Sequence, residues 1–288
     1  MRKLALSGVI LSGAALAAAP AFAQSGCTRE SLQDAADSYV AAQTTGDRTQ
    51  MSMGHGYRYL ENRTPVEIDN GLINKALSID YVNGLLDEEE CAAFVEMVVL
   101  DPAHPYVIGT RLDVSDDGLI EQIDALVTDS DDWLFDAAGF HDAVKDEDWG
   151  EIPAGERDTR QTLIDAATAY YDRFEDPTVV VPFGEQCYRV EGGARTNASA
   201  DAPANSCPLG MPEEPGQLQL VERSFLAYPA LGAVVGFSLF GATGGEPDIH
   251  LFRVENGGIR YVHAMTACSD NGCDFGTGSA LGPGAGPD

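Results

Sequence analysis

The sequence predicts an α+β fold built from two tandem units, each an N-terminal helix packed on a curved antiparallel sheet. The chain matches itself at a fixed offset of 131 residues, which is typical of a duplicated unit. In each copy a helical pattern precedes short runs rich in β-branched and aromatic residues. The last two runs flank Asn256-Gly257, the dipeptide most typical of a two-residue β-hairpin. Each unit is therefore expected to place its helix first and its sheet after it.

Both units are expected to open with an amphipathic helix. Thr28 and Thr159 stand at the head of the matching segments, and apolar residues follow each of them at helical spacing. A threonine before such a run is a typical helix N-cap, because its hydroxyl can accept a hydrogen bond from the first helical turn. The same gapless offset later pairs Tyr57-Arg58 with Tyr188-Arg189.

Strands are expected after each helix. In the first unit they are predicted over 57–63, 94–100, 106–114 and 119–128. In the second unit they are predicted over 186–191, 218–225, 233–240 and the hairpin within 247–268. Gly84-Leu85-Leu86, leading into Asp87-Glu88-Glu89-Glu90, is interpreted as a turn between strands.

The domain boundaries follow from composition. Residues 1–23 have the basic start, apolar centre and Ala21-Phe22-Ala23 ending of a secretory signal peptide, with a single membrane anchor as the less favoured alternative. The first unit is assigned to 24–130 and the second to 159–268. The segment 131–158 connects them and contains Trp133 and Trp149, which we expect to pack against the units. The Gly/Pro-rich tail, 269–288, is expected to be disordered beyond Cys273. The mature chain is therefore expected to be secreted or periplasmic.

The charge balance limits the partners. The chain has 17 Lys and Arg against 46 Asp and Glu, a net charge of −29. Removal of the signal peptide deletes Arg2 and Lys3, which leaves 15 against 46, or −31. Such a surface repels nucleic acid and anionic lipid, so we expect neither nucleic-acid nor membrane partners. The acids are spread along the chain, which favours adaptation to a saline medium over an acidic functional patch.

The cysteines indicate disulfides. All six lie after the signal peptide, and an even number in an oxidising compartment is typical of disulfide pairs. Fifteen pairings are possible for six cysteines. The favoured set is Cys27–Cys91, Cys187–Cys207 and Cys268–Cys273. Metal ligation is the alternative, but no Cys-x2-Cys or His-x3-His pair supports it.

The Asn256-Gly257 hairpin carries the candidate catalytic residues. If these two residues form the loop, cross-strand partners have numbers that sum to 513, so that His250 faces His263. Asp248 and Tyr261 then lie on the same face, because side chains alternate along a strand. Two imidazoles with a carboxylate that orients one of them and a phenol that donates a proton would suit acid–base chemistry near neutral pH. A different loop would slip the register and separate the histidines.

Two alternatives to catalysis remain open for this group. The histidines can be structural, either satisfied in the core or facing solvent. Both histidines with Asp248 could also form a facial set for zinc or a similar ion. We expect no cofactor.

A rival cluster in the first unit could bind a sugar or phenolic ligand. Along a strand, alternate residues from His55 to Arg63 fall on one face, and Tyr57, Tyr59, Glu61 and Arg63 would supply rings, hydroxyls and charges. The alternative is an exposed sheet face with a cross-strand ion pair. His104 is expected in a loop at a strand entrance, where it could line a pocket.

The order of elements resembles a known fold. A helix followed by a bent sheet that ends in a hairpin is similar to the NTF2-like (SnoaL-like, ketosteroid-isomerase-like) cone. That resemblance implies an apolar pocket between helix and sheet, and tandem halves that pack as an intrachain pseudo-dimer. The chain also resembles a family of secreted fungal and bacterial proteins of unknown function. This second resemblance rests on four segments: 27–29, 101–109, 132–135 and 260–263.

The favoured function is a secreted, cofactor-independent acid–base enzyme of lyase, dehydratase or isomerase type, acting on a small polyol, uronate or phenolic molecule. The alternative is a non-catalytic exported protein that binds a small ligand or a partner. Gly-x-Ser-x-Gly, P-loop and Gly-x-Gly-x-x-Gly motifs do not occur in the sequence, so serine hydrolase, kinase and nucleotide oxidoreductase functions have little support.

Overall fold

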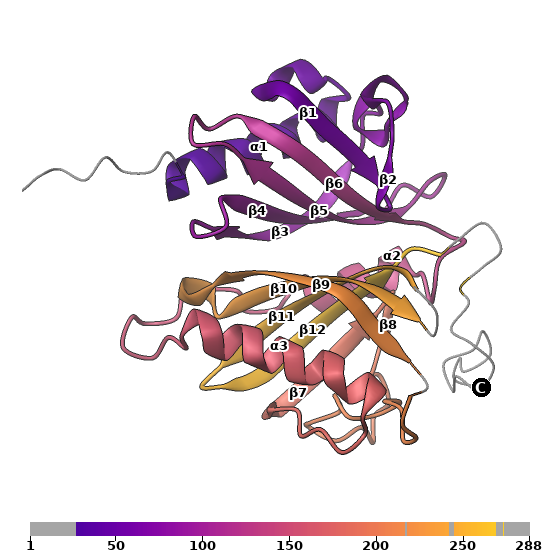
Figure 1. Ribbon diagram of the computed structural model, residues 1–288. Helices are drawn as coiled ribbons and strands as arrows, with labels where there is room; N and C mark the ends of the chain where they lie inside the picture. The colour runs from indigo at the N-terminus through magenta and orange to yellow at the C-terminus, as the bar shows by residue number, and fades with distance from the viewer. Residues whose placement is uncertain (1–26, 217, 242–244, 269–272, 274–288) are drawn as a thin grey trace, which may run out of the picture.

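Two six-stranded sheets, one in each half of the chain, form the fold (Figure 1). The computed structural model describes residues 27–216, 218–241, 245–268 and 273. Within these residues the chain contains three α-helices and belongs to the α+β class, as the sequence predicts. The predicted signal peptide and, apart from Cys273, the tail 269–288 lie outside the described residues.

The two expected helices are present with the expected caps. Helix α1 spans Arg29–Thr45 and helix α3 spans Arg160–Glu175. Thr28 Oγ1 accepts a hydrogen bond from Ser31 N at 3.2 Å, and Thr159 Oγ1 accepts one from Thr162 N at 3.1 Å. Both helices bury one apolar face, so the duplicated segment is confirmed as the helix that opens each half.

The strands follow the same order in both halves. In the first half they are β1 (Met53–Glu61), β2 (Thr64–Pro65), β3 (Ile79–Asp87), β4 (Ala92–Val99), β5 (Tyr106–Val114) and β6 (Ile120–Thr128). In the second half they are β7 (Phe183–Glu191), β8 (Ala194–Arg195), β9 (Gln219–Tyr228), β10 (Ala233–Gly241), β11 (Glu246–Glu255) and β12 (Gly258–Thr266). The sheet orders are β2-β1-β6-β5-β4-β3 and β8-β7-β12-β11-β10-β9. Short 3₁₀ turns lie at Arg48–Gln50, Ile68–Asn70, Leu72–Asn74 and Pro229–Leu231.

Three expectations about the sheets are wrong in detail. Each sheet is mixed, because β1 runs parallel to β6 and β7 parallel to β12. The other strands of each half supply the long crossover that a parallel pair requires. The expected turn between strands is present at 88–91, but Gly84 to Leu86 belong to β3 and not to the turn. A Cβ at Gly84 would lie 2.3 Å from Phe94 O, so the glycine permits close approach of β4.

The third error concerns the repeat. The turns after β1 and β7 match at an offset of 130, since Glu61 pairs with Thr64 and Glu191 pairs with Ala194. The second half therefore has one residue fewer between its helix cap and the end of its first strand.

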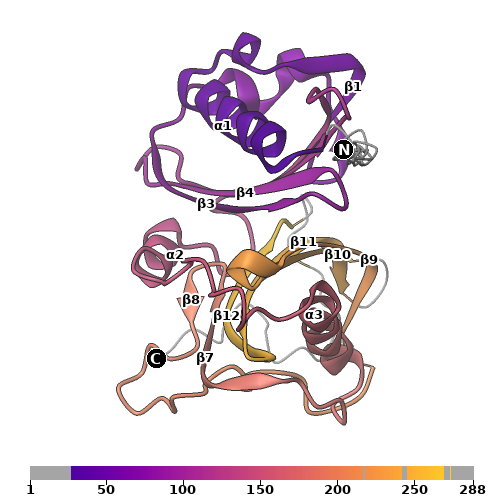
Figure 2. The same ribbon diagram turned by 90° about the vertical axis from the view of Figure 1, so that its left-hand side faces the viewer.

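The two sheets face each other and the helices α1 and α3 cover their outer sides (Figure 2). Helix α2 (Ala137–Val144), which the sequence did not predict, lies beside the junction of the halves. Trp149 packs against an apolar cluster shared by both halves, and Trp133 is buried in the second half. The connecting segment thus packs against the fold, as its tryptophans indicated. The shared cluster includes Leu85, Phe94, Val107 and Leu126 from the first sheet and Val235, Phe237, Ile249 and Met265 from the second.

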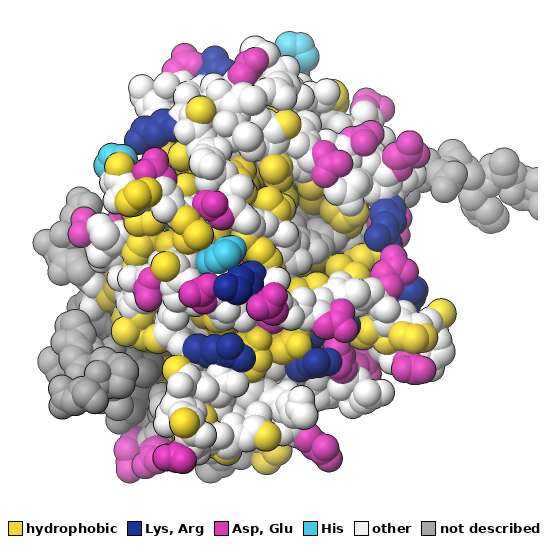
Figure 3. Space-filling view, turned by 180° about the vertical axis from the view of Figure 1, so that it is seen from behind, with side chains coloured by type: hydrophobic (Ala, Val, Ile, Leu, Met, Phe, Trp, Pro, Cys, Tyr) yellow, Lys and Arg dark blue, Asp and Glu magenta, His cyan; other side chains and the backbone are white. Residues whose placement is uncertain are grey.

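All three predicted disulfides are present. Cys27–Cys91 joins the start of α1 to the β3–β4 turn, and Cys187–Cys207 closes the long loop after β8. Cys268–Cys273 follows β12. No helix of the described part of the chain is long and apolar enough to cross a bilayer. On the face in Figure 3 acidic side chains are dispersed over both halves, which agrees with their spread along the sequence.

Candidate functional site

A β-bulge at Arg260 decides where the predicted catalytic residues lie. Next to the turn, Val254 pairs with Ile259, and the two numbers sum to the expected 513. One step further, Arg253 pairs with Tyr261, so β12 carries one extra residue. His263 consequently faces Leu251 and not His250. The expectation that the two histidines, Asp248 and Tyr261 share one sheet face is therefore wrong.

Asp248 and His250 remain together on the face that packs on α3. Asp248 Oδ2 accepts a hydrogen bond from His250 Nδ1 at 2.7 Å, which fixes the proton on Nδ1 because a carboxylate only accepts. The carboxylate also accepts hydrogen bonds from Ser238 at 3.1 Å and Thr266 at 2.8 Å. The rings of Tyr170 and Tyr171 lie against His250, and both tyrosines are fully buried. Asp248 therefore does orient an imidazole, that of His250, as predicted. Both side chains are buried beneath α3.

His263 lies on the opposite face, between two carboxylates at the junction of the halves. Nδ1 is 3.0 Å from both oxygens of Glu96 on β4, and Nε2 is 2.8 Å from Glu147 of the connecting segment. Burial lowers the pKa of His263, but the charges of Glu147 and Glu96, with their hydrogen bonds, outweigh this and raise the pKa to about 10. His263 is therefore a protonated ion-pair partner that joins the two halves.

The second carboxylate of this network is itself fully bonded. Glu147 accepts hydrogen bonds from the Tyr188 hydroxyl at 2.6 Å and from Trp149 Nε1 at 2.9 Å. Burial, followed by the negative charge of Glu147, raises the pKa of Tyr188 well above its usual value. Tyr261 lies nearby with its ring against Trp149 and Tyr188.

The geometry does not favour the metal alternative for these residues. The two carboxylates bind opposite nitrogens of the His263 ring, so their oxygens do not converge on one point. His250 lies on the other face of the sheet, so the predicted facial set of two histidines and Asp248 is not formed.

The first-half residues do not form one ligand-binding stripe. Tyr59 is buried and donates to Glu61 at 2.6 Å. Arg63 lies in the turn after β1, at φ 63°, and pairs with Glu222 of the second half at 3.1 Å. His55 is exposed and Tyr57 is partly buried where β1 departs from β6. His104 is an exposed loop residue between β4 and β5, as expected. Of this set, Glu61 lines an open hollow of about 820 Å³ at the end of the first half.

Half of the polar side chains around that hollow are already engaged by the fold. Glu61 binds Tyr59 and the backbone N–H of Leu72. Both ends of the Asn62 amide bind Val127 backbone atoms, at 3.2 and 2.8 Å. Asp132 accepts hydrogen bonds from the backbone N–H groups of Asp129 and Cys268. The exposed side chains of Asn70, Lys75, Ser130 and Asp131 also line the hollow and make no hydrogen bond within the described residues.

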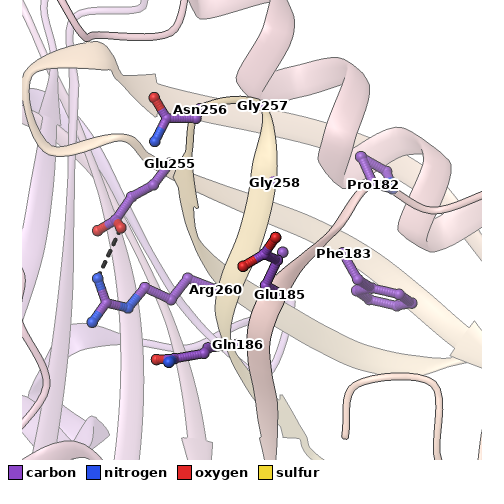
Figure 4. Close-up of a pocket in the computed structure, with 10 residues that line it drawn as sticks. Pro182, Phe183, Glu185, Gln186, Glu255, Asn256, Gly257, Gly258 and Arg260 are labelled. Atoms are coloured by element: carbon purple, nitrogen blue, oxygen red, sulfur yellow. Dashed lines mark hydrogen bonds and ion pairs between the residues drawn. The ribbon is translucent and has the colours of Figure 1, made fainter. Parts of the chain in front are cut away.

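A second open hollow, of about 730 Å³, lies at the hairpin tip (Figure 4). It forms where β7 separates from β12. Phe183 pairs with Ile259, and the next pair is Tyr188 with Tyr261. Four residues of β7 therefore lie opposite the single residue Arg260. Figure 4 shows Arg260 reaching toward Glu255 with Gln186 beside it, whereas Phe183 points away on the far side of β7. We call this the Arg260 hollow; its side-chain walls are Pro182, Phe183, Glu185, Gln186, Glu255, Asn256 and Arg260.

Arg260 is held in a fixed orientation by a row of charges. Glu255 accepts from Arg260 at 2.8 Å with one oxygen and from Arg253 Nε at 2.9 Å with the other. Arg253 is buried and also donates to Gly150 O at 3.0 Å and to Leu231 O. The guanidinium of Arg260 lies over the Tyr261 ring, 5.0 Å from its centroid. The bulged residue is thus preorganised, and a third of its side chain remains exposed.

The polar side chains around Arg260 are available to a ligand. Glu185, Gln186 and Asn256 are exposed, and within the described residues their side chains make no hydrogen bond. Together they offer two amides and a carboxylate beside a fixed guanidinium. Apart from the Asn256-Gly257 turn, no sequence pattern indicates this site, because the bulge that projects Arg260 has no local motif.

Comparison with known families gives one match. A model described as a domain of unknown function (DUF8021) matches residues 156–266, which contain α3 and the whole second sheet. A search of curated proteins finds no match to the chain. The matched region includes the Arg260 hollow, the Asp248–His250 pair and His263.

Proposed function

We propose that this chain is an exported, non-catalytic binding protein that holds a small neutral, polyhydroxylated ligand in the Arg260 hollow. Its two halves would be NTF2-like cones that pack as an intrachain pseudo-dimer, with His263 between the carboxylates that join them. Secretion or export is supported by the leader-like start of the sequence and by three disulfides.

The observation that carries this proposal is the contrast between buried and open polar groups. His263 and Asp248 are closed off from solvent on opposite faces, where carboxylate or hydroxyl partners already satisfy them. The Arg260 hollow, by contrast, is open, has a volume within the range of roughly 300–1,000 Å³ typical of small-molecule sites, and presents unpaired donors and acceptors. Vicinal hydroxyls both donate and accept, so they match a guanidinium flanked by amides and carboxylates.

Calorimetric titration with neutral monosaccharides, disaccharides and polyols tests the proposal. The Arg260→Gln variant should bind at least about tenfold more weakly, a loss of roughly 1.4 kcal/mol. Glu121→Gln is the matched control, because Glu121 occupies the corresponding bulge of the first half. Absence of binding by the unaltered protein, or equal affinity in the Arg260→Gln variant, would contradict the proposal.

A second candidate is the acid–base enzyme, now confined to the face of the second sheet that packs on α3. It is favoured by the Tyr171 hydroxyl, which is fully buried close to Ser238 and Asp248. Gly236 leaves it room, since a Cβ there would lie 2.3 Å from that oxygen. With His250 beside the Tyr171 ring and Asp248 fixing its tautomer, this group could move a proton on a small molecule admitted between sheet and helix.

Elimination assays test the enzyme candidate: with uronates the new carbon–carbon double bond is conjugated to the carboxylate and absorbs in the ultraviolet, and with polyols and phenolic compounds the products are separated by chromatography. The His250→Gln variant should lose turnover, whereas the exposed His55→Gln control should retain it. Turnover that survives in His250→Gln would remove this candidate.

A further inference from the structure

We infer that the ligand of the Arg260 hollow is an extended neutral glycan chain, bound across Arg260 in two adjoining subsites. This inference rests on the proposed binding function and specifies the size and charge of the ligand. It comes from a second hollow of about 250 Å³ on the other side of the bulged residue.

The two hollows share one wall. Glu255, Asn256 and Arg260 line both of them. The remaining wall of the second hollow comes from Arg253 of β11 and from the connecting segment, whose lining residues lie between Asp148 and Glu156. A ligand seated beside Arg260 in the first hollow can therefore continue past the hairpin tip onto the connecting segment.

The volume of the second hollow indicates that it extends the first binding site and is not a separate site. The second hollow is smaller than a typical small-molecule pocket, whereas the first falls within that range. A second subsite for one or two further sugar units fits these volumes. Both hollows are open, so neither end of a chain is blocked.

The second hollow is also rigid where it meets the first. Arg253 lies between Glu255 and the connecting segment and donates to Gly150 O at 3.0 Å. Ile152 N donates to Ala230 O at 2.8 Å, and Arg157 Nε donates to Ile152 O at 2.7 Å. The two subsites therefore have a fixed spacing, which lowers the entropic cost of binding a chain in both.

Charge selects a neutral glycan over an acidic one. Glu185 lines the first hollow, and Asp148, Glu151 and Glu156 line the second. These carboxylates can accept hydrogen bonds from sugar hydroxyls, but they would repel uronates or sulfated units. The strongly negative net charge of the whole chain acts in the same direction.

The experiment is a calorimetric series with neutral β-1,4- and α-1,4-linked glucans from the disaccharide to the hexasaccharide. For the linkage that binds, affinity should rise by at least about tenfold between the two lengths, or roughly 1.4 kcal/mol. Glu156→Ala, in the second hollow, should reduce the ratio of hexasaccharide to disaccharide affinity. Glu185→Ala, in the first hollow, should weaken both.

The outcomes separate this inference from the function on which it rests. If the disaccharide binds and depends on Arg260 but affinity does not rise with length, the extended site is wrong and the proposed function stands. If Glu156→Ala leaves the ratio unchanged, the second hollow is not a subsite. If none of these glucans binds, the glycan inference is contradicted, and the proposed function falls with it only if the neutral monosaccharides and polyols also fail to bind. Tighter binding of an oligouronide than of the neutral glucans would overturn the charge argument.

Discussion

At the scale of single residues, the molecule uses one histidine as a buried cation between two carboxylates and the other as a hydrogen-bond donor to a single carboxylate. His263 has a carboxylate on each ring nitrogen, one from the first half and one from the connecting segment. A buried charge with such partners is stabilising only while the partners are present. His250 instead has a single carboxylate partner, which hydroxyl groups also bind.

Replacement of His263 should cost stability in a pH-dependent manner. The His263→Gln variant leaves two carboxylates facing each other without a cation, so we expect a loss of about 3–5 kcal/mol in the free energy of unfolding. The folded-state pKa of about 10 exceeds the ordinary value of 6.5. The stabilisation is therefore complete below about pH 6.5 and is lost as pH rises through 10.

Urea unfolding from pH 6 to 10.5 measures this effect. The difference between the unaltered protein and His263→Gln should shrink as the pH rises. The His55→Gln control, at an exposed position, should follow the unaltered protein throughout. A difference that is constant across the range would show that His263 is not a titrating cation.

At the scale of elements, the duplicated helices and the bulges are the features that recur in both halves. Strand β6 has a bulge at the position that corresponds to the Arg260 bulge of β12, and its extra residue is Glu121. Glu121 lies between the Asp113–Gln122 and Val114–Ile120 pairs. Opposite these bulges, the first strand of each half also leaves its parallel neighbour: β1 leaves β6, and β7 leaves β12. The bulge is thus a property of the repeated unit, and the residue that it projects differs in charge between the halves.

The helix caps should contribute equally in the two halves. Thr28→Ala and Thr159→Ala each remove a hydroxyl acceptor for a helical N–H, so each should cost about 1 kcal/mol. Thr→Ser at either position retains the hydroxyl and should cost much less. Chemical denaturation of the four variants checks this; an alanine variant as stable as its serine counterpart would show that the cap is unimportant there.

Much of the element pattern was predictable, and the site was not. Local signals identify α1, α3, the Asn256-Gly257 turn and the disulfides, because caps, turn residues and cysteine spacing act over a few positions. The face of His263 depends on the bulge, which arises from pairing with β7 and has no signature near Arg260. Glu96 and Glu147 lie 167 and 116 positions from His263, so no local pattern could bring them to it.

At the scale of the whole molecule, the two sheets meet through corresponding positions that have diverged. The strand registers match Asp124 of the first half to His263 of the second, and Glu96 to Phe237. Glu96 and His263 form an ion pair, whereas Asp124 and Phe237 line a small cavity of about 20 Å³ between the halves. The polar pair thus occurs at only one of the two corresponding places.

The polar contact should couple the halves energetically. In a double-mutant cycle, Glu96→Gln and His263→Gln should show an interaction energy of roughly 1–3 kcal/mol, because the two side chains are buried and 3.0 Å apart. Unfolding monitored by fluorescence and by circular dichroism should give coincident transitions. Additive effects of the two substitutions would contradict coupling through this pair.

The most direct test of the binding account is an amide NMR titration of the mature protein with a neutral glucan oligosaccharide. The account predicts chemical-shift changes at residues 182–186 and 255–260, which line the Arg260 hollow, and smaller ones at 148–156. Shifts that centre on Asp248 and His250, or on the β1 residues Tyr57 and Tyr59, would contradict it, as would a spectrum unchanged at saturating glucan.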